Sequence, residues 1–239
     1  MGAWSSLAID IEASHFYITT ADQSIYTFDL ATRSFLKQQK LSPPVPNLAE
    51  IITVGSGVVM GFRPENRTIY KIDPSTGINS PFTIASSSTF VPWTFTADIA
   101  NGKFYIIGVN GSKVLHSFDS STGAETVKQL DLDYVSINGV VLGREGKLLA
   151  RVSDGNSGNF YVINPLSGAS TILETTIRLS GFYANTLTSD PENNRFYILG
   201  GGTLIYAFDL STGEIQKNPP PKLTGIAIPQ ALRAVPLLP

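Results

Sequence analysis

The stretch Leu204-Ile205-Tyr206-Ala207-Phe208-Asp209-Leu210-Ser211-Thr212-Gly213-Glu214-Ile215 is one copy of a unit that recurs along the chain. Four other copies share its apolar and aromatic residues ending in Asp or Asn, at Ile25–Asp29, Ile69–Asp73, Leu115–Asp119 and Phe160–Asn164. The closing Asp or Asn residues are 44, 46, 45 and 45 residues apart. The chain is therefore built from five repeats of one unit.

Each copy runs into residues typical of a tight turn. Four residues after the Asp or Asn stand, in chain order, Arg33, Gly77, Gly123, Gly168 and Gly213. Asp or Asn that opens a turn accepts a hydrogen bond from a backbone N–H two residues later, and Gly supplies positive φ without a steric penalty. The copies are thus predicted to be strands that end in tight turns. Because Arg33 departs from this pattern, we expect the first turn to be strained or longer.

A second motif precedes the aromatic strands of three repeats. In each, an Asp stands six residues before a Phe-Tyr-Ile segment, at Asp10, Asp98 and Asp190. Equal spacing in three copies indicates one hairpin turn built three times. Asp at such a position commonly accepts a hydrogen bond within the turn. These carboxylates are therefore predicted to be structural rather than catalytic.

Every repeat is predicted to contain four short strands. Helical periodicity is not sustained, and the second and third strands carry consecutive apolar residues, as in sheets buried on both faces. The fourth strand is the most polar, which suits an outer edge, and is expected at 34–40, 82–85, 125–130, 170–174 and 214–217. A period of about 45 residues is typical of propeller blades. The prediction is an all-β fold, a five-bladed β-propeller of four-stranded antiparallel blades.

The repeats account for nearly the whole chain, so we expect a single domain, 1–239, of five repeats of about 45 residues. After the fifth repeat, Ile228–Val235 is interpreted as a further inner strand that closes the ring. The two chain ends would then compete for one place. We expect one of them to pair in the sheet and the other to be displaced to a face.

Composition excludes several classes of function. Hydrophobic residues make up 42% of the chain and charged residues 15%, which is typical of a globular protein with a sizeable core. The net charge of −2 argues against nucleic acid as a partner, and no apolar run is long enough to cross a membrane. Cysteine is absent, so there are no disulfides. Met1–Trp4 shows no signal pattern; we expect a soluble protein and leave its compartment open, including secretion after removal of a signal peptide.

The repeat Ile205–Gly213, with the turn segment Asp190–Tyr197, resembles blades of the β-propeller superfamily that includes YVTN and quinoprotein-like propellers. The resemblance covers nearly the whole chain and implies architecture rather than activity, because such propellers serve as enzymes, lectins and docking platforms. The Trp that usually closes quinone-binding blades is missing. No cofactor is therefore expected from this resemblance.

A local segment is similar to a different group. Ser136–Val140, followed by Gly143–Lys147, resembles the inner strand of gluconolactonase-like and strictosidine-synthase-like propellers, where an Asn before Gly helps to hold a divalent cation. The resemblance implies Asn138 as a ligand and places Asn185 where that family uses Asp. The structural alternative is that Asn138-Gly139 is simply a turn dipeptide. We therefore expect no metal, with a divalent cation as the alternative.

Loops that vary among the repeats are the predicted place of function, since they are free of the repeated turn template. They join the second and third strands and enter each inner strand, on one face of a propeller. With nearby inner-strand residues they supply the ligand-binding candidates Trp4, Trp93, Asn138, Asp154, Asn156, Tyr183, Asn185 and Arg233. Aromatic rings beside amides and carboxylates suit a small polar ligand. The structural alternative is that Trp4, Trp93 and Tyr183 only plug a narrow channel.

Two functions of different classes follow. The preferred one is non-catalytic recognition, lectin-like, of a small polar, sugar-like ligand or of a protein partner at the variable-loop face. The alternative is a small-molecule enzyme of the lactonase or strictosidine-synthase type that uses the central channel. His116 replaces the Tyr of its repeat and is predicted to be packed, and His15 is predicted to be solvated. No nucleophile motif supports a hydrolytic triad.

Overall fold

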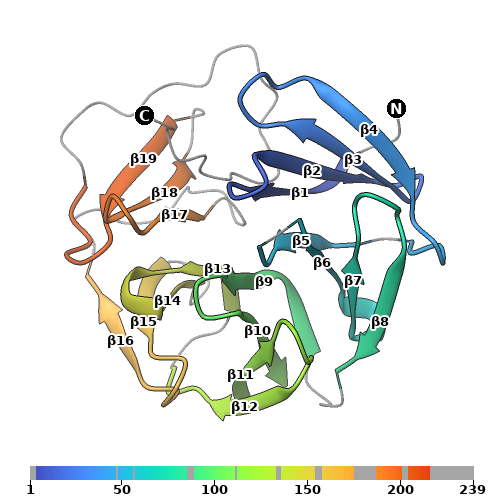
Figure 1. The fold of residues 1–239 in the computed structure, drawn as a ribbon. Coiled ribbons are helices and arrows are strands. Elements are labelled where there is room, and N and C mark those ends of the chain that lie inside the picture. Colours follow the sequence, from blue (N-terminus) through green and yellow to red (C-terminus); the bar gives the residue numbers. More distant parts are fainter. Residues whose placement is uncertain are drawn as a thin grey trace. The chain divides into compact units, whose positions relative to one another are not determined.

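The computed structural model describes residues 4–46, 48–55, 57–84, 89–110, 112–132, 136–153, 158–174, 187–200 and 204–215. In these ranges the only helical segments are two single 3-10 turns, η1 (Pro64–Asn66) and η2 (Arg144–Gly146). The strands form five antiparallel sheets that follow one another along the sequence (Figure 1). The fold is that of a five-bladed all-β propeller, as the repeat predicts.

Strands within each sheet pair in chain order, so each blade is a simple meander. The first blade contains β1 (Trp4–Asp10), β2 (His15–Thr20), β3 (Ser24–Asp29) and β4 (Phe35–Lys40). The second contains β5 (Glu50–Thr53), β6 (Val59–Arg63), β7 (Thr68–Ile72) and β8 (Asn79–Thr83). The third contains β9 (Thr89–Asp98), β10 (Lys103–Asn110), β11 (Ser112–Asp119) and β12 (Glu125–Gln129).

The remaining blades have the same order. The fourth contains β13 (Ser136–Leu142), β14 (Leu148–Ser153), β15 (Gly158–Ile163) and β16 (Ser170–Leu173). The fifth contains β17 (Thr188–Asp190), β18 (Arg195–Gly200) and β19 (Leu204–Asp209), and a bridge between Phe208 and Ile215 marks the place of its fourth strand. The closing strand predicted at 228–235 lies outside the described residues.

The chain divides into two compact units. The first comprises Met1–Gly111 and His116–Thr126, and the second comprises Ser112–Leu115 and Val127–Pro239. The first unit holds the first two blades and most of the third, whereas the second unit holds the fourth and fifth blades.

The hydrophobic core of each unit lies between consecutive sheets. In the first unit Phe62 of β6 packs against Phe95 of β9, with ring centroids 5.8 Å apart. In the second unit Phe160 of β15 contacts Phe196 of β18, with centroids 4.6 Å apart. Burying a Phe side chain contributes roughly 1.5–3 kcal/mol, so these contacts between neighbouring sheets stabilise each unit. Most residues of β6 and β7 in the second blade are buried, because their sheet packs between those of the first and third blades, as the consecutive apolar residues predict.

Polar side chains also join the inner strands of the first unit at a spacing of one repeat. The backbone N–H of Ile51 donates to Ser6 Oγ at 2.9 Å, and that of Phe95 donates to Glu50 Oε2 at 3.4 Å. Both pairs are 45 residues apart. Thr53 Oγ1 adds a bond of 2.6 Å to the carbonyl oxygen of Ile9. The inner strands β5 and β9 are therefore each placed in register against the inner strand of the preceding blade.

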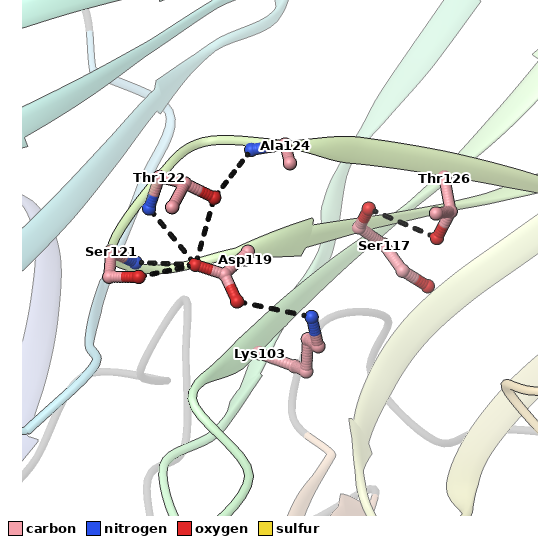
Figure 2. Close-up of polar contacts among 7 residues, drawn as sticks. All are labelled: Lys103, Ser117, Asp119, Ser121, Thr122, Ala124 and Thr126. Carbon is pink, nitrogen blue, oxygen red and sulfur yellow. Dashed lines mark hydrogen bonds and ion pairs between the residues drawn. The ribbon is translucent and has the colours of Figure 1, made fainter.

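The turn between the third and fourth strands has the predicted geometry in every blade. Figure 2 shows that of the third blade, where Asp119 Oδ1 accepts hydrogen bonds from the backbone N–H groups of Ser121 and Thr122 at 3.1 and 2.9 Å. Lys103 Nζ lies 3.2 Å from Asp119 Oδ2. Hydrogen bonds hold the pKa of Asp119 well below its usual range, and the largest effect comes from the Ser121 hydroxyl. The turn closes with a bond of 2.8 Å from Gly123 N–H to the Asp119 carbonyl.

The first turn is strained but not longer. Arg33 N–H donates to the Asp29 carbonyl at 2.9 Å, as the glycines do in the other copies. Arg33 has a φ of 59°, in the left-handed region that costs a residue with a side chain about 1–2 kcal/mol. The expectation of a strained or longer turn is thus met by strain, because the Arg adopts the conformation that Gly has in the other copies.

The three repeated carboxylates are turn formers, as predicted. Asp10 accepts from Ala13 N–H at 2.9 Å, Asp98 from Asn101 N–H at 3.2 Å, and Asp190 from Asn193 N–H at 3.3 Å. All three side chains are buried. Their position at the end of an inner strand is thus set by backbone hydrogen bonds.

The fourth strand of the second repeat differs from its prediction. It runs over Asn79–Thr83 rather than 82–85, and Pro81 lies opposite Tyr70. Asn-Ser-Pro reads as a loop in the sequence, but an outer edge strand tolerates Pro because one row of its N–H groups makes no ladder bonds.

The two histidines lie in different surroundings. His116 is completely buried, as predicted, and its Nδ1 lies 2.6 Å from Glu125 Oε1. The sequence did not reveal this carboxylate partner. His15 is half-buried beside Tyr17, with ring centroids 6.1 Å apart, and is less solvated than predicted.

Candidate functional site

The predicted ligand-binding residues are only partly covered by the structure. Trp4 lies in β1, Trp93 in β9 and Asn138 in β13. The others lie outside the described residues, namely Asp154, Asn156, Tyr183, Asn185 and Arg233. The variable-loop site therefore stays a prediction.

Asn138 stands at an irregularity of the innermost strand. Ile137 pairs with Val152 and Gly139 pairs with Arg151, so Asn138 is the extra residue of a β-bulge. Bulges redirect a side chain and are frequent beside functional sites. Asn138 is half-buried and makes interactions of its own. Its place on the inner strand agrees with the prediction, while its role stays untested.

Arg151, opposite Gly139, is a polar residue that the sequence reasoning missed. Its side chain is 5% exposed, and burial lowers its pKa to about 10. The residues in its place in the first three blades are Thr19, Phe62 and Ile107, all buried and uncharged. The signal was present in the sequence as a cation within the apolar second strand.

A pocket lies between the fourth and fifth blades. It is at the end of the fourth blade that carries the turn from Gly143 to Lys147, away from Asn138 and Arg151. We call it the turn pocket, and its volume is about 330 Å³. One wall consists of the apolar side chains Leu149, Val162, Leu173 and Leu210, which belong to the core cluster between these two blades. The pocket is therefore an opening of the core toward solvent, within the second unit.

The mouth of the turn pocket is polar and charged. It is lined by Arg144, Glu145, Lys147, Thr171 and Ser211. Arg144 Nη1 donates to Ser211 Oγ at 3.5 Å, which links the first turn of the fourth blade to the last turn of the fifth. Glu145 Oε1 lies 3.9 Å from Arg144 Nε, and Glu145 Oε2 lies 3.6 Å from Lys147 Nζ. The mouth thus carries two cations and one carboxylate.

The local sequence explains why this turn differs from those of the first, third and fifth blades. Gly143 takes the place of the repeated Asp, since its N–H donates to the Lys147 carbonyl at 2.7 Å across the start of the hairpin. Three residues separate Gly143 from Lys147, whereas four separate Asp98 from Lys103. The hairpin closes through a 3-10 turn in which Glu145 has a φ of 57°. The fourth repeat has therefore lost the buried carboxylate and one turn residue at the pocket.

Two general properties bear on the site. Among the described residues, no three His, Asp or Glu side chains gather as in a metal centre. Of the helices in the part of the chain that the structure covers, none has the length and apolar character of a membrane span.

No protein-family model matches the chain, and no curated protein matches its sequence. The resemblance to gluconolactonase-like propellers thus remains a prediction.

Solved structures do share the fold. BamB from Moraxella catarrhalis aligns over 92% of this chain with 16% identity and a TM-score of 0.53, and streptogramin B lyase over 92% with 15% identity and a TM-score of 0.65. Hydrazine synthase from Kuenenia stuttgartiensis aligns over 87% with 13% identity and a TM-score of 0.57. The chain spans 66%, 69% and 64% of these three chains, respectively. At such identities the likeness shows the propeller fold alone.

Proposed function

We propose that the protein is a non-catalytic recognition propeller that binds a small ligand in the turn pocket. The observation that supports this most directly is that the pocket has an apolar wall, which includes Leu149 and Leu210, and a polar mouth at Arg144 and Lys147. Pockets of about 300 Å³ or more, mostly apolar with a few convergent polar groups, are the usual form of small-molecule sites. The turn that forms the mouth is also one that departs from the repeat.

Recognition is favoured over catalysis by the side chains present. The described lining contains no His, and its hydroxyl groups belong to Thr171 and Ser211, the second of which accepts a bond from Arg144. Nucleophilic catalysis needs a nucleophile beside a base. The names of two similar structures, a synthase and a lyase, are those of enzymes, but a shared fold does not transfer activity.

The variable-loop face remains a second place for recognition in this proposal. Trp93 and Tyr183 would stack on a sugar-like ligand or contact a protein partner there, with Asp154 and Asn156 fixing polar groups. The arguments for the two sites are independent, because the turn pocket lies at the turn end of the fourth blade.

A bulky side chain at the mouth provides the test. Thr171 is exposed and lies opposite Val162, on the face of β16 that lines the pocket, so Thr171→Trp should fill it. Thr126→Trp is the matched control, because both residues follow the turn Asp or Asn by seven positions and both are exposed. Binding of octanoate, octanamide and octylamine is measured by ligand-observed NMR and titration calorimetry.

At least one of the three probes should bind, and Thr171→Trp should weaken it tenfold or more while Thr126→Trp leaves it unchanged. Equal binding by both variants, or no binding of any probe to the natural protein, contradicts the proposal.

A further inference from the structure

The charge at the mouth of the turn pocket distinguishes it from the corresponding turns of the first, third and fifth blades. Where Asp10, Asp98 and Asp190 place a buried carboxylate, the fourth repeat has Gly143. Lys147 directly precedes the second strand, which Lys103 and Arg195 open in their repeats, and Arg144 adds a further cation. With Glu145 counted, this turn carries two cations and one carboxylate where the pocket opens, whereas the turn from Asp98 to Lys103 carries one of each.

The carboxylate that faces these cations is held loosely. The side chains of Arg144, Glu145 and Lys147 are 58%, 66% and 47% exposed, and the distances of 3.9 and 3.6 Å exceed those of good charge-assisted hydrogen bonds. Exposed ion pairs of this kind contribute little. Glu145 also holds a left-handed backbone conformation that side chains disfavour. An incoming anion can take the place of Glu145 at small cost.

The positions of the cations and of the apolar wall suit one type of molecule. The Arg144 guanidinium lies beside the opening, with its Nη1 3.5 Å from Ser211 Oγ, and planar guanidinium groups bind carboxylates and phosphates through paired hydrogen bonds. Behind the opening, Leu149, Val162 and Leu173 offer only apolar contact. A ligand that satisfies both parts has a charged head and an uncharged, apolar body.

We infer that the turn pocket selects organic anions, that is, molecules with one carboxylate or similar anionic group on an aliphatic or aromatic body. This inference rests on the proposed function and specifies its ligand class. Arg144 and Lys147 bind the head group, Glu145 is the carboxylate that the ligand displaces, and the leucines and Val162 contact the body.

The experiment compares octanoate with octanamide, which has the same chain but no charge. Octanoate should bind the natural protein about tenfold more tightly, and raised salt should reduce this preference because exposed charges are screened. Arg144→Gln should remove most of the preference by weakening octanoate and not octanamide. Glu145→Gln should do the reverse and tighten octanoate, because it removes the competing carboxylate.

Lys128→Gln, at an exposed position in β12 that does not line the pocket, changes the net charge equally and should leave both affinities unchanged. Lengthening the chain should raise affinity by about fourfold per buried methylene until the pocket is full. Equal binding of octanoate and octanamide, or tighter binding of octylamine, overturns the anion inference while the pocket itself stands. Absence of binding by all probes overturns the proposed function instead.

Discussion

A β-carbon on Gly213 would lie 2.2 Å from the carbonyl oxygen of Glu174, at the end of the outer strand of the preceding blade. Gly168 and Gly77 approach Gln129 and Lys40 in the same way, at 2.2 and 2.1 Å. Gly123 has the same role in its turn, with a φ of 72°, but no atom of the described residues lies within 4 Å of its β-carbon position. The glycines thus serve two separate purposes, positive φ in the turn and close contact between blades.

Gly213→Ala and Gly123→Ala separate these purposes, because both residues have a φ of 72°. Gly123→Ala should lower the free energy of unfolding by about 1–2 kcal/mol, the cost of a side chain in the left-handed region. Gly213→Ala should cost about 1–3 kcal/mol more, because the methyl group must displace a backbone carbonyl. Urea unfolding of both variants measures the difference. Equal losses would show that the contact between blades relaxes freely.

Because the turn carboxylates accept hydrogen bonds in their charged form, we expect the stability of the fold to fall in acid. Asp119→Asn tests this expectation. Hydrogen bonds from Ser121 and Thr122 and the contact with Lys103 lower the folded-state pKa of Asp119 below its ordinary value of 3.8. Its contribution to stability is therefore complete above 3.8 and is lost as the pH falls through the lower folded-state pKa. Asn keeps one acceptor oxygen but loses the charge, so the variant should unfold at lower urea concentration at pH 7. This difference should shrink below pH 3.8, as acid unfolding curves of the two proteins would show; a constant difference would contradict it.

Trp93→Ala tests the variable-loop site. If that face binds a ligand by stacking, the variant should lose at least tenfold in affinity for a sugar or protein found to bind there, and its thermal unfolding should stay cooperative. Chelator treatment should change nothing. If chelation and Asn138→Ala both abolish an activity, the channel holds a catalytic cation and the lactonase-like alternative replaces recognition at that face.

Much of the fold could be predicted because its determinants are local. The turn at Asp119 needs only an Asp, two following N–H groups and a Gly, all within five residues of the sequence. The spacing of such turns then gave the number of blades. The predicted bounds of a strand were wrong where the local preference of a residue disagreed with its place in the sheet. Pro81 favours a loop by itself but is accepted in an outer edge strand.

The turn pocket could not be predicted from the repeat in the same way. Its walls come from Leu149 and Leu210, which are distant in the sequence and meet only when two sheets pack. The usable signal was a departure from the pattern, Gly143 in the place of an Asp. Likewise, the Glu125 partner of His116 comes from the next strand, so the sequence shows the substitution of Tyr by His without its compensation.

The hydrogen bonds from Ile51 to Ser6 and from Phe95 to Glu50 also restrict how such a chain can evolve. Each joins residues 45 positions apart, so inserting one residue between them within an inner strand would shift a donor away from its acceptor and turn alternate side chains to the wrong face. Insertions are tolerated in the loops, because the hydrogen bonds between inner strands do not fix the length of the loops. We therefore expect such a chain to gain or lose whole repeats, because a partial repeat would leave an inner strand without its matching partner.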